Sequence, residues 1–247
     1  MRRIGICCSK GGVAKTTTAV NLAYGLARTG RVLLVDADTQ GHCARLLGVK
    51  SEKGLAESIE GTSAADVLTQ VRPNLWLLAG GQALGKSKNL IAREDFGRET
   101  VLTKALAPLE NRFEYCVVDT SPGWDVITVN VLFFVNEVLC PVSLEALAVD
   151  GLGTFLQSVQ PIIELRRKAG ESMEITYILP TFYDRRVKKS DELMAQLEKH
   201  FGDRVCEPIR YSARLSEAPA WGKVIFEYAP KDQGAQDYAK LLGRIVA

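Results

Sequence analysis

The chain has 247 residues, of which 47% are hydrophobic and 24% are charged, and its formal net charge is +2. This composition is ordinary for a globular protein, and the length accommodates one large α/β domain covering residues 1–247. No apolar run approaches the roughly 18–20 residues needed to span a bilayer. The small net charge does not argue for nucleic acid, so such a site must come from local clusters. The first residues lead into a predicted strand instead of a signal peptide, so we expect a cytoplasmic protein.

Six cysteines are present, and their placement argues against disulfides and metal ligation. Cys7, Cys8, Cys116 and Cys140 lie in apolar runs that predict buried strands, and Cys206 lies beside another such run. No C-x-x-C spacing occurs. Because a buried cysteine behaves as a small hydrophobic residue, we expect reduced core thiols.

A glycine-rich stretch at residues 9–17 carries the clearest chemical signal. It follows an apolar run at residues 4–8, and it precedes apolar residues at helical spacing between positions 19 and 27. A strand, a glycine-rich turn and a helix start aim backbone N–H groups at one point, where a phosphate binds. Lys15 then supplies charge for the β- and γ-phosphates, and the Thr16 hydroxyl is placed for Mg²⁺. An ordinary turn is the structural alternative, but the context on both sides favours a phosphate site.

Two further predicted strands end in carboxylates. The apolar run at residues 32–38 ends in Asp36 and Asp38, at the edge of an α/β sheet where ligands bind. Helix capping or solvated loop acids are the alternative for these two residues. A second apolar run ends in Asp119, followed by a Pro-Gly turn; this is the Walker B arrangement, in which the aspartate holds Mg²⁺. We interpret His42 as a polar residue at a helix start.

The remaining pattern alternates between strands and helices, which predicts a doubly wound, mostly parallel α/β sheet with helices on both faces. The expected elements are strands at 75–78, 137–142 and 175–179, and helices at 98–109, 145–168, from near residue 190, and 231–247. Residues 48–73 look less regular, and residues 80–88 look like a surface loop. Pro161 interrupts one predicted helix. The basic cluster at the end of that helix is interpreted as structural.

A basic cluster in the last third of the chain is the strongest local charge signal. The candidate DNA-contacting residues are Arg185, Arg186, Lys188 and Lys189 in one predicted loop, with Arg214 and Lys223 in the next loop–helix region. A solvated charge run is the usual alternative for such a cluster.

Several motifs resemble the ParA/MinD family of positioning ATPases, and the likeness covers nearly the whole chain. The stretch from Lys10 to Thr17 is similar to the deviant Walker A box, K-G-G-x-x-K-T-T, with Ala14 where glycine is usual. The segment after Asp36 resembles the box D-x-D-P-Q-G, and residues 214–219 read R-L-S-E-A-P, as in short ParA proteins. Arg210 and Tyr211 stand where such chains usually have Pro and Arg.

The resemblance implies a P-loop NTPase fold and a set of residue roles. In the family, two subunits enclose two ATP molecules, and Lys10 matches the lysine that reaches the partner's phosphates. The nucleotide-contacting positions would be Lys10, Gly11, Gly12, Val13, Ala14, Lys15, Thr16, Thr17 and, at the adenine, Thr181. Asp38 matches the acid that orients the attacking water, Asp36 a group near Mg²⁺, and Asp119 the Walker B ligand. Arg186 and Arg214 match positions used for sequence-independent DNA binding.

The implied function is an ATPase that hydrolyses ATP to ADP and phosphate, with ATP and Mg²⁺ as cofactors and a homodimer as the active form. The dimer would bind double-stranded DNA nonspecifically, associate with the nucleoid, and position a plasmid or chromosome through a ParB-like adaptor, without a membrane. A MinD-like membrane-surface ATPase is one alternative, although the C-terminal segment lacks its basic and bulky apolar faces. A dethiobiotin-synthetase-like ligase, an iron–sulfur reductase and a non-catalytic scaffold are the others.

Overall fold

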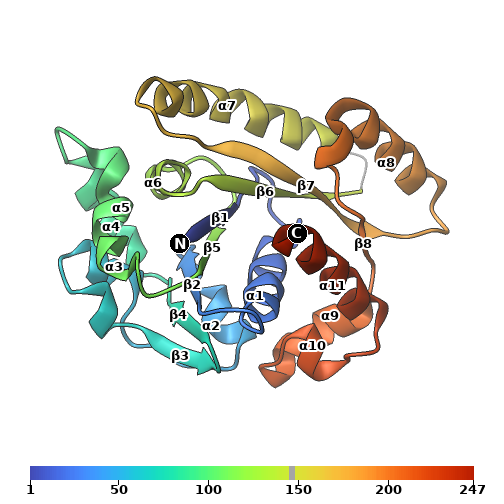
Figure 1. The fold of residues 1–247 in the computed structure, drawn as a ribbon, viewed down its shortest axis with the longest axis horizontal. Helices are drawn as coiled ribbons and strands as arrows, with labels where there is room; N and C mark the ends of the chain where they lie inside the picture. Colours follow the sequence, from blue (N-terminus) through green and yellow to red (C-terminus); the bar gives the residue numbers. More distant parts are fainter. Residues whose placement is uncertain (145–147) are drawn as a thin grey trace.

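The computed structural model describes residues 1–144 and 148–247. Within these residues, eight strands form one sheet in the order β3-β4-β2-β5-β1-β6-β7-β8 (Figure 1). The strands are β1 (Arg2–Ile6), β2 (Val32–Ala37), β3 (Thr69–Arg72), β4 (Leu75–Leu78), β5 (Tyr115–Thr120), β6 (Glu137–Ser143), β7 (Glu174–Tyr183) and β8 (Ile209–Arg210). All neighbouring pairs are parallel except β3 and β4, which are antiparallel. The predicted fold class is confirmed.

Helices cover both faces of this sheet (Figure 1). They are α1 (Lys15–Leu26), α2 (His42–Leu46), α3 (Leu55–Ile59), α4 (Leu84–Ala92), α5 (Val101–Leu106), α6 (Val126–Phe134), α7 (Ala148–Lys168), α8 (Lys188–Phe201), α9 (Ala213–Glu217), α10 (Ile225–Tyr228) and α11 (Gln233–Val246). Helices α4 to α8 pack in one hydrophobic cluster, and α1, α2, α10 and α11 pack in the other. Strand β2 serves both clusters, because Leu33 and Val35 face one and Val32 and Leu34 face the other. Burial on both faces explains why its sequence is apolar throughout.

Four elements differ from the sequence-based expectation. The predicted surface loop at residues 80–88 is wrong, because α4 starts at Leu84 and buries Leu84, Ser87 and Ile91 at helical spacing. Only two of these three residues are apolar, so the period is weak in the sequence. The irregular stretch at residues 48–73 contains α3 and the edge strand β3. Helix α6 was not predicted, since it is apolar at nearly every position and shows no amphipathic period.

Two element boundaries differ from the predicted ones, and this changes the secondary structure assigned to residues with predicted functions. Strand β7 extends to Tyr183, so residues 180–183, predicted as a loop, pair with β6 and β8. Helix α8 begins at Lys188, so Lys188 and Lys189 lie in its first turn and not in the preceding loop. Helix α7 continues through Pro161, and the predicted residues 145–147 lie outside the described part of the chain.

In the basic cluster at the end of α7, residues 166–168, Arg166 has a structural role. The guanidinium group of Arg166 is buried and donates to the carbonyl oxygens of Leu132 and Val135, at the C-terminal end of α6. A cation at a helix C-terminus satisfies free carbonyl groups and complements the helix dipole. Arg166 therefore joins α7 to α6.

Candidate nucleotide site

The loop between β1 and α1 has a fixed shape. Gly12 and Ala14 both have positive φ angles, of 74° and 66°. The Ser9 hydroxyl donates to the carbonyl of Gly151 over 2.9 Å, and the Thr181 hydroxyl donates to the carbonyl of Val13 over 3.3 Å. These bonds tie the loop to α7 and β7. The first N–H groups of α1 have no acceptor within their own helix, and residues 15–17 line a preformed hollow that suits an anion.

Lys15 is the first residue of α1 and is buried beneath this loop. Its ammonium group donates to the carbonyl oxygen of Lys10 over 2.8 Å. Burial lowers the pKa of Lys15, whereas nearby Asp119 and Asp38 act in the opposite direction. A desolvated ammonium group attracts an anion more strongly than one in bulk water. The residue is thus placed to neutralise a phosphate in the hollow.

A cavity of about 280 Å³ lies over the loop and holds most of the predicted phosphate-side residues. It is lined by Gly11, Gly12, Ala14, Lys15, Thr16, Thr17, Asp38, Gln40, His42, Thr120 and Pro122. His42, interpreted from the sequence as a polar residue at a helix start, does begin α2, but it also faces this cavity. Lys10 is not part of the described lining. Asp38 accepts a hydrogen bond from the Gln40 N–H over 3.0 Å and is the carboxylate that borders the space.

A second cavity, of about 320 Å³, adjoins the first, since both contain Gly12, Ala14 and Thr17 in their walls. Thr181, predicted at the adenine, lines it together with Tyr211 and Arg210. The Arg210 side chain is held by Asp237, with Nη2 and Oδ1 2.7 Å apart. The two adjacent cavities offer one space for phosphates and one for a nucleoside.

Asp36 and Asp119 lie behind the phosphate cavity, at paired positions of neighbouring strands β2 and β5. Both carboxyl groups are fully buried. Burial raises the pKa of both, and for Asp119 the charge of Asp36 raises it further, while the Thr16 hydroxyl and Lys15 act in the opposite direction. Asp36 accepts hydrogen bonds from the N–H groups of Asp38 and Cys43.

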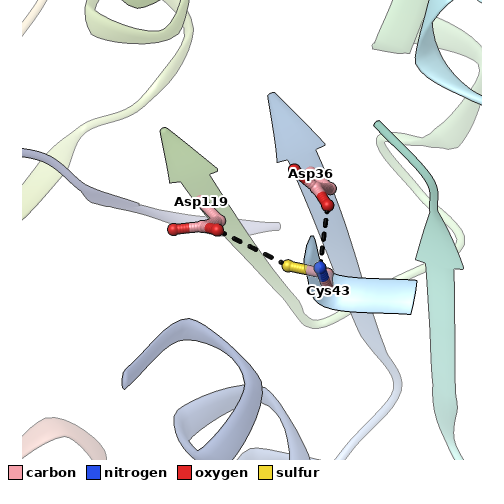
Figure 2. A group of neighbouring side chains, drawn as sticks. All are labelled: Asp36, Cys43 and Asp119. Atoms are coloured by element: carbon pink, nitrogen blue, oxygen red, sulfur yellow. Dashed lines mark hydrogen bonds between the residues drawn. The ribbon is translucent and has the colours of Figure 1, made fainter. Parts of the chain in front are cut away.

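Cys43 completes this cluster, and the sequence interpretation missed it. Figure 2 shows Cys43 between the two aspartates, with its Sγ 3.6 Å from Oδ2 of Asp119. The other oxygen of Asp119, Oδ1, is buried without a hydrogen-bond partner among the described residues. The available signal was position, because Cys43 lies in the first turn of α2, just after an acidic strand end.

The donor set at this place fits a magnesium ion. Carboxylate and hydroxyl oxygens are ligands that Mg²⁺ prefers, and it usually takes only one or two protein carboxylates beside phosphate and water. Asp36, Asp119 and Thr16 supply such oxygens, and the partnerless oxygen of Asp119 is an atom that a cation would satisfy.

The predicted DNA-contacting residues are all exposed, but the structure gathers only some of them. Arg185 and Arg186 line a hollow of about 250 Å³ together with Arg210. Arg186 pairs with Asp184 and Arg214 pairs with Glu217, each at 2.7 Å. The other members are Lys188 and Lys189 at the start of α8, and Lys223 before α10. Arg214 and Lys223 do not line that hollow.

The fold, the loop and the acidic strand ends define a P-loop-type ATPase. Residues 1–172 match the family model of an AAA domain. The whole chain is 35% identical to the chromosome-partitioning ATPase Soj of Thermus thermophilus and covers 96% of it. It matches apo McdA of Cyanothece with a TM-score of 0.88 at 24% identity, over 100% of both chains.

A metabolic enzyme also shares the architecture. Cobyrinic acid a,c-diamide synthase of Mycobacterium smegmatis, with bound ATP analog and magnesium, matches with a TM-score of 0.84 at 26% identity, over 100% of this chain and 94% of the synthase. The identity of 35% to Soj, over nearly the full length of both proteins, exceeds the 26% identity to the synthase, so the comparison favours the partition ATPases. The chain belongs to the ParA/MinD-type partition ATPases.

Proposed function

We propose that residues 1–247 form one ATPase domain that binds ATP and Mg²⁺, pairs with a second copy, and then binds duplex DNA without sequence preference. A ParB-like adaptor would trigger hydrolysis and release, so that a plasmid or chromosome is moved. The observation that carries this proposal is the joint placement of Lys15 and Asp38 at one preformed cavity, backed by the aspartate pair. The similarity to Soj supports the partition role.

Residue roles follow from this placement. Lys15 would neutralise the β- and γ-phosphates, with the loop N–H groups and Thr17 holding the phosphate chain. Thr16, Asp119 and Asp36 would hold Mg²⁺, which supplies charge neutralisation when bound. Asp38 borders the cavity and would orient the attacking water. Phosphoryl transfer needs mainly positioning and electrostatic stabilisation, which these groups provide.

Lys10 is proposed to act on the partner's nucleotide. Its carbonyl accepts from Lys15, but its side chain is not part of the described lining of its own phosphate cavity. The Lys10 side chain instead lies against α7. The Cβ of Lys10 is 3.6 Å from the position that a Cβ on Gly151 would occupy. A lysine outside the lining of its own phosphate cavity is available to a second subunit.

The C-terminal helix supports DNA over a membrane surface as the binding partner. The apolar face of α11, with Ala235, Tyr238, Leu241 and Ile245, is buried in the cluster that contains α1. An interfacial membrane helix needs such a face free. No described helix combines the length and apolar character required to cross a bilayer.

The remaining alternatives find less support. An iron–sulfur reductase needs accessible cysteines, and all six thiols of this chain are free and buried. A metabolic ligase has no use for the basic residues at the start of α8. The helix dipole disfavours cations at that end, and the exposed ion pair of Lys188 with Glu192, at 3.9 Å, offsets little of this, so a bound phosphate would favour both lysines there.

The active-site roles can be tested by comparing Asp38→Ala with Lys10→Ala. Asp38→Ala should still bind ATP and accumulate as a dimer, but hydrolyse on the order of a hundredfold more slowly, about 2.7 kcal/mol in barrier. Lys10→Ala should remain monomeric with ATP. Light scattering with ATP–Mg²⁺ and phosphate release measure the two properties. Wild-type turnover by Asp38→Ala, or a normal dimer of Lys10→Ala, would contradict the assignment.

A further inference from the structure

Cys43 donates one hydrogen bond to each of the two buried aspartates. Its N–H donates to Oδ2 of Asp36 over 2.9 Å, and its Sγ donates to Oδ2 of Asp119 over 3.6 Å (Figure 2). The side chain is fully buried, and it stands on the first turn of α2. The thiol is therefore fixed in position beside two carboxylates.

The spacing of these groups matches a metal site that contains sulfur. One ligand atom from each of Asp36, Cys43 and Asp119 lies within 4.8 Å of the others. Zinc bonds of about 2.3 Å to sulfur and about 2.0 Å to oxygen, at a tetrahedral angle, place the two ligand atoms about 3.5 Å apart. The observed distance from Sγ to Oδ2 of Asp119 is 3.6 Å, so this edge already has the required length.

A second observation concerns the other oxygen of the Asp119 carboxylate, which points away from Cys43 in Figure 2. Oδ1 of Asp119 is buried and has no hydrogen-bond partner in the described part of the chain. A buried carboxylate oxygen without a partner is costly, and a cation bound by both oxygens of Asp119 removes that cost. Asp36 keeps capacity for a metal as well, because each of its oxygens accepts one hydrogen bond and has a second lone pair.

We propose that Asp36, Cys43 and Asp119 form a site for a thiophilic divalent ion such as Zn²⁺, and that this ion competes with Mg²⁺ for the two aspartates. The inference rests in part on the proposed function, because the aspartates are shared with the magnesium site. A thiolate ligand favours Zn²⁺, whereas Mg²⁺ takes oxygen ligands. On binding, the thiol proton leaves to solvent and the ion takes its place between sulfur and Oδ2 of Asp119. Three protein ligands leave a fourth position open.

Cobalt, a spectroscopic substitute for zinc, tests this in the untagged, nucleotide-free protein. The wild type should develop thiolate-to-cobalt charge-transfer absorption that saturates at one ion per chain and disappears on adding Zn²⁺. Cys43→Ser and Cys43→Ala should lack the band and bind cobalt at least about tenfold more weakly, since the thiolate ligand is lost. Cys116→Ala, which removes a buried thiol on β5 outside the cluster, is the matched control and should keep the band.

Circular dichroism of each variant establishes that it is folded. Absence of the band from saturated wild type, or its persistence in both Cys43 variants, overturns the proposal. The two histidines give no sulfur band, so binding at exposed His42 does not imitate the expected result. Because no nucleotide is present, a negative result here is distinct from failure of the ATPase proposal, which is tested by Asp38→Ala and Lys10→Ala.

Discussion

At the scale of single residues, Ala14 shows a local cost at the phosphate loop. It caps α1 in the left-handed conformation, with φ of 66°. That conformation costs a residue with a Cβ roughly 1–2 kcal/mol, and glycine avoids the cost. The family pattern has glycine at this position, so the substitution in this chain stores strain where the nucleotide would bind.

Ala14→Gly should therefore stabilise the protein. The greater freedom of glycine in the unfolded chain offsets about 0.4–1 kcal/mol of the relieved strain, so the net gain in the free energy of unfolding is about 0–1.6 kcal/mol. Urea denaturation measures the difference. Ala239→Gly, at an exposed position inside α11, is the control and should lose about 1 kcal/mol. Equal losses in both variants would contradict the strain at Ala14.

Asp119 carries a second residue-scale cost, which depends on pH. Its pKa is raised by burial and by Asp36, so above about pH 4 the folded state binds more protons than the unfolded state. Stability of the metal-free protein should then fall as the pH rises from that value through the raised pKa. Asp119→Asn carries no charge, so with EDTA it should melt above wild type at pH 8, by a margin that shrinks at pH 5.

Thermal melts across this pH range measure the margin. Asp66→Asn, which changes an exposed carboxylate, is the control and should follow the wild-type profile. If the melting temperature of Asp119→Asn exceeded that of the wild type by more at acid pH than at pH 8, the Asp119 carboxylate would not be destabilising in the folded state.

At the scale of elements, the short strand β8 depends on α11. Asp237 of α11 is buried and accepts from the backbone N–H of Arg210 over 2.9 Å and from its guanidinium group. Because β8 has two residues, these bonds supply much of its attachment. Arg210 also lines the nucleoside cavity, so the ion pair links the C-terminal helix to that cavity.

Asp237→Ala should cost on the order of 2 kcal/mol, because it leaves the N–H and the guanidinium group of Arg210 without their acceptor. Nucleotide affinity should fall as well, since the wall of the cavity loosens. Urea denaturation and titration with a fluorescent ATP analogue measure the two effects. Lys240→Ala removes an exposed ion pair on the same helix and should change neither. Unchanged nucleotide affinity in Asp237→Ala would separate the ion pair from the site.

At the scale of the whole molecule, DNA binding should depend on position and not on net charge. Arg186→Glu with Arg214→Glu should abolish ATP-dependent duplex binding while dimerisation persists, since neither residue lines the phosphate cavity. Each lost phosphate contact should flatten the slope of log K against log salt by about 0.9. Asp184→Asn should instead tighten binding, because it frees Arg186 from its intramolecular partner.

The matched control is Arg28→Glu with Arg112→Glu, at exposed positions before β2 and β5. Those strands start there, so these residues lie at the opposite edge of the sheet from the phosphate loop. Both double variants change the net charge from +2 to −2, and only the first should lose DNA in filter binding across salt. Equal losses, or tight binding without nucleotide, would mean that the basic residues form only a solvated surface.

The sequence by itself determined the order of strands and helices around the phosphate loop, because glycine-rich turns, apolar strands and strand-end acids are local patterns. For the same reason it pointed to Lys15, Asp36, Asp38 and Asp119 as candidate site residues. It failed at α4 and α6, whose patterns are weakly periodic or uniformly apolar, and at the boundary of α8.

Only the tertiary structure placed Cys43 between two aspartates from different strands. Parallel pairing of β2 with β5 brings together positions 36 and 119, which lie 83 residues apart in the chain. It also showed that Arg186 and Arg214 already have acidic partners, and that Arg210 pairs with Asp237. Such contacts depend on packing between distant segments, and no local period or motif in the chain records them.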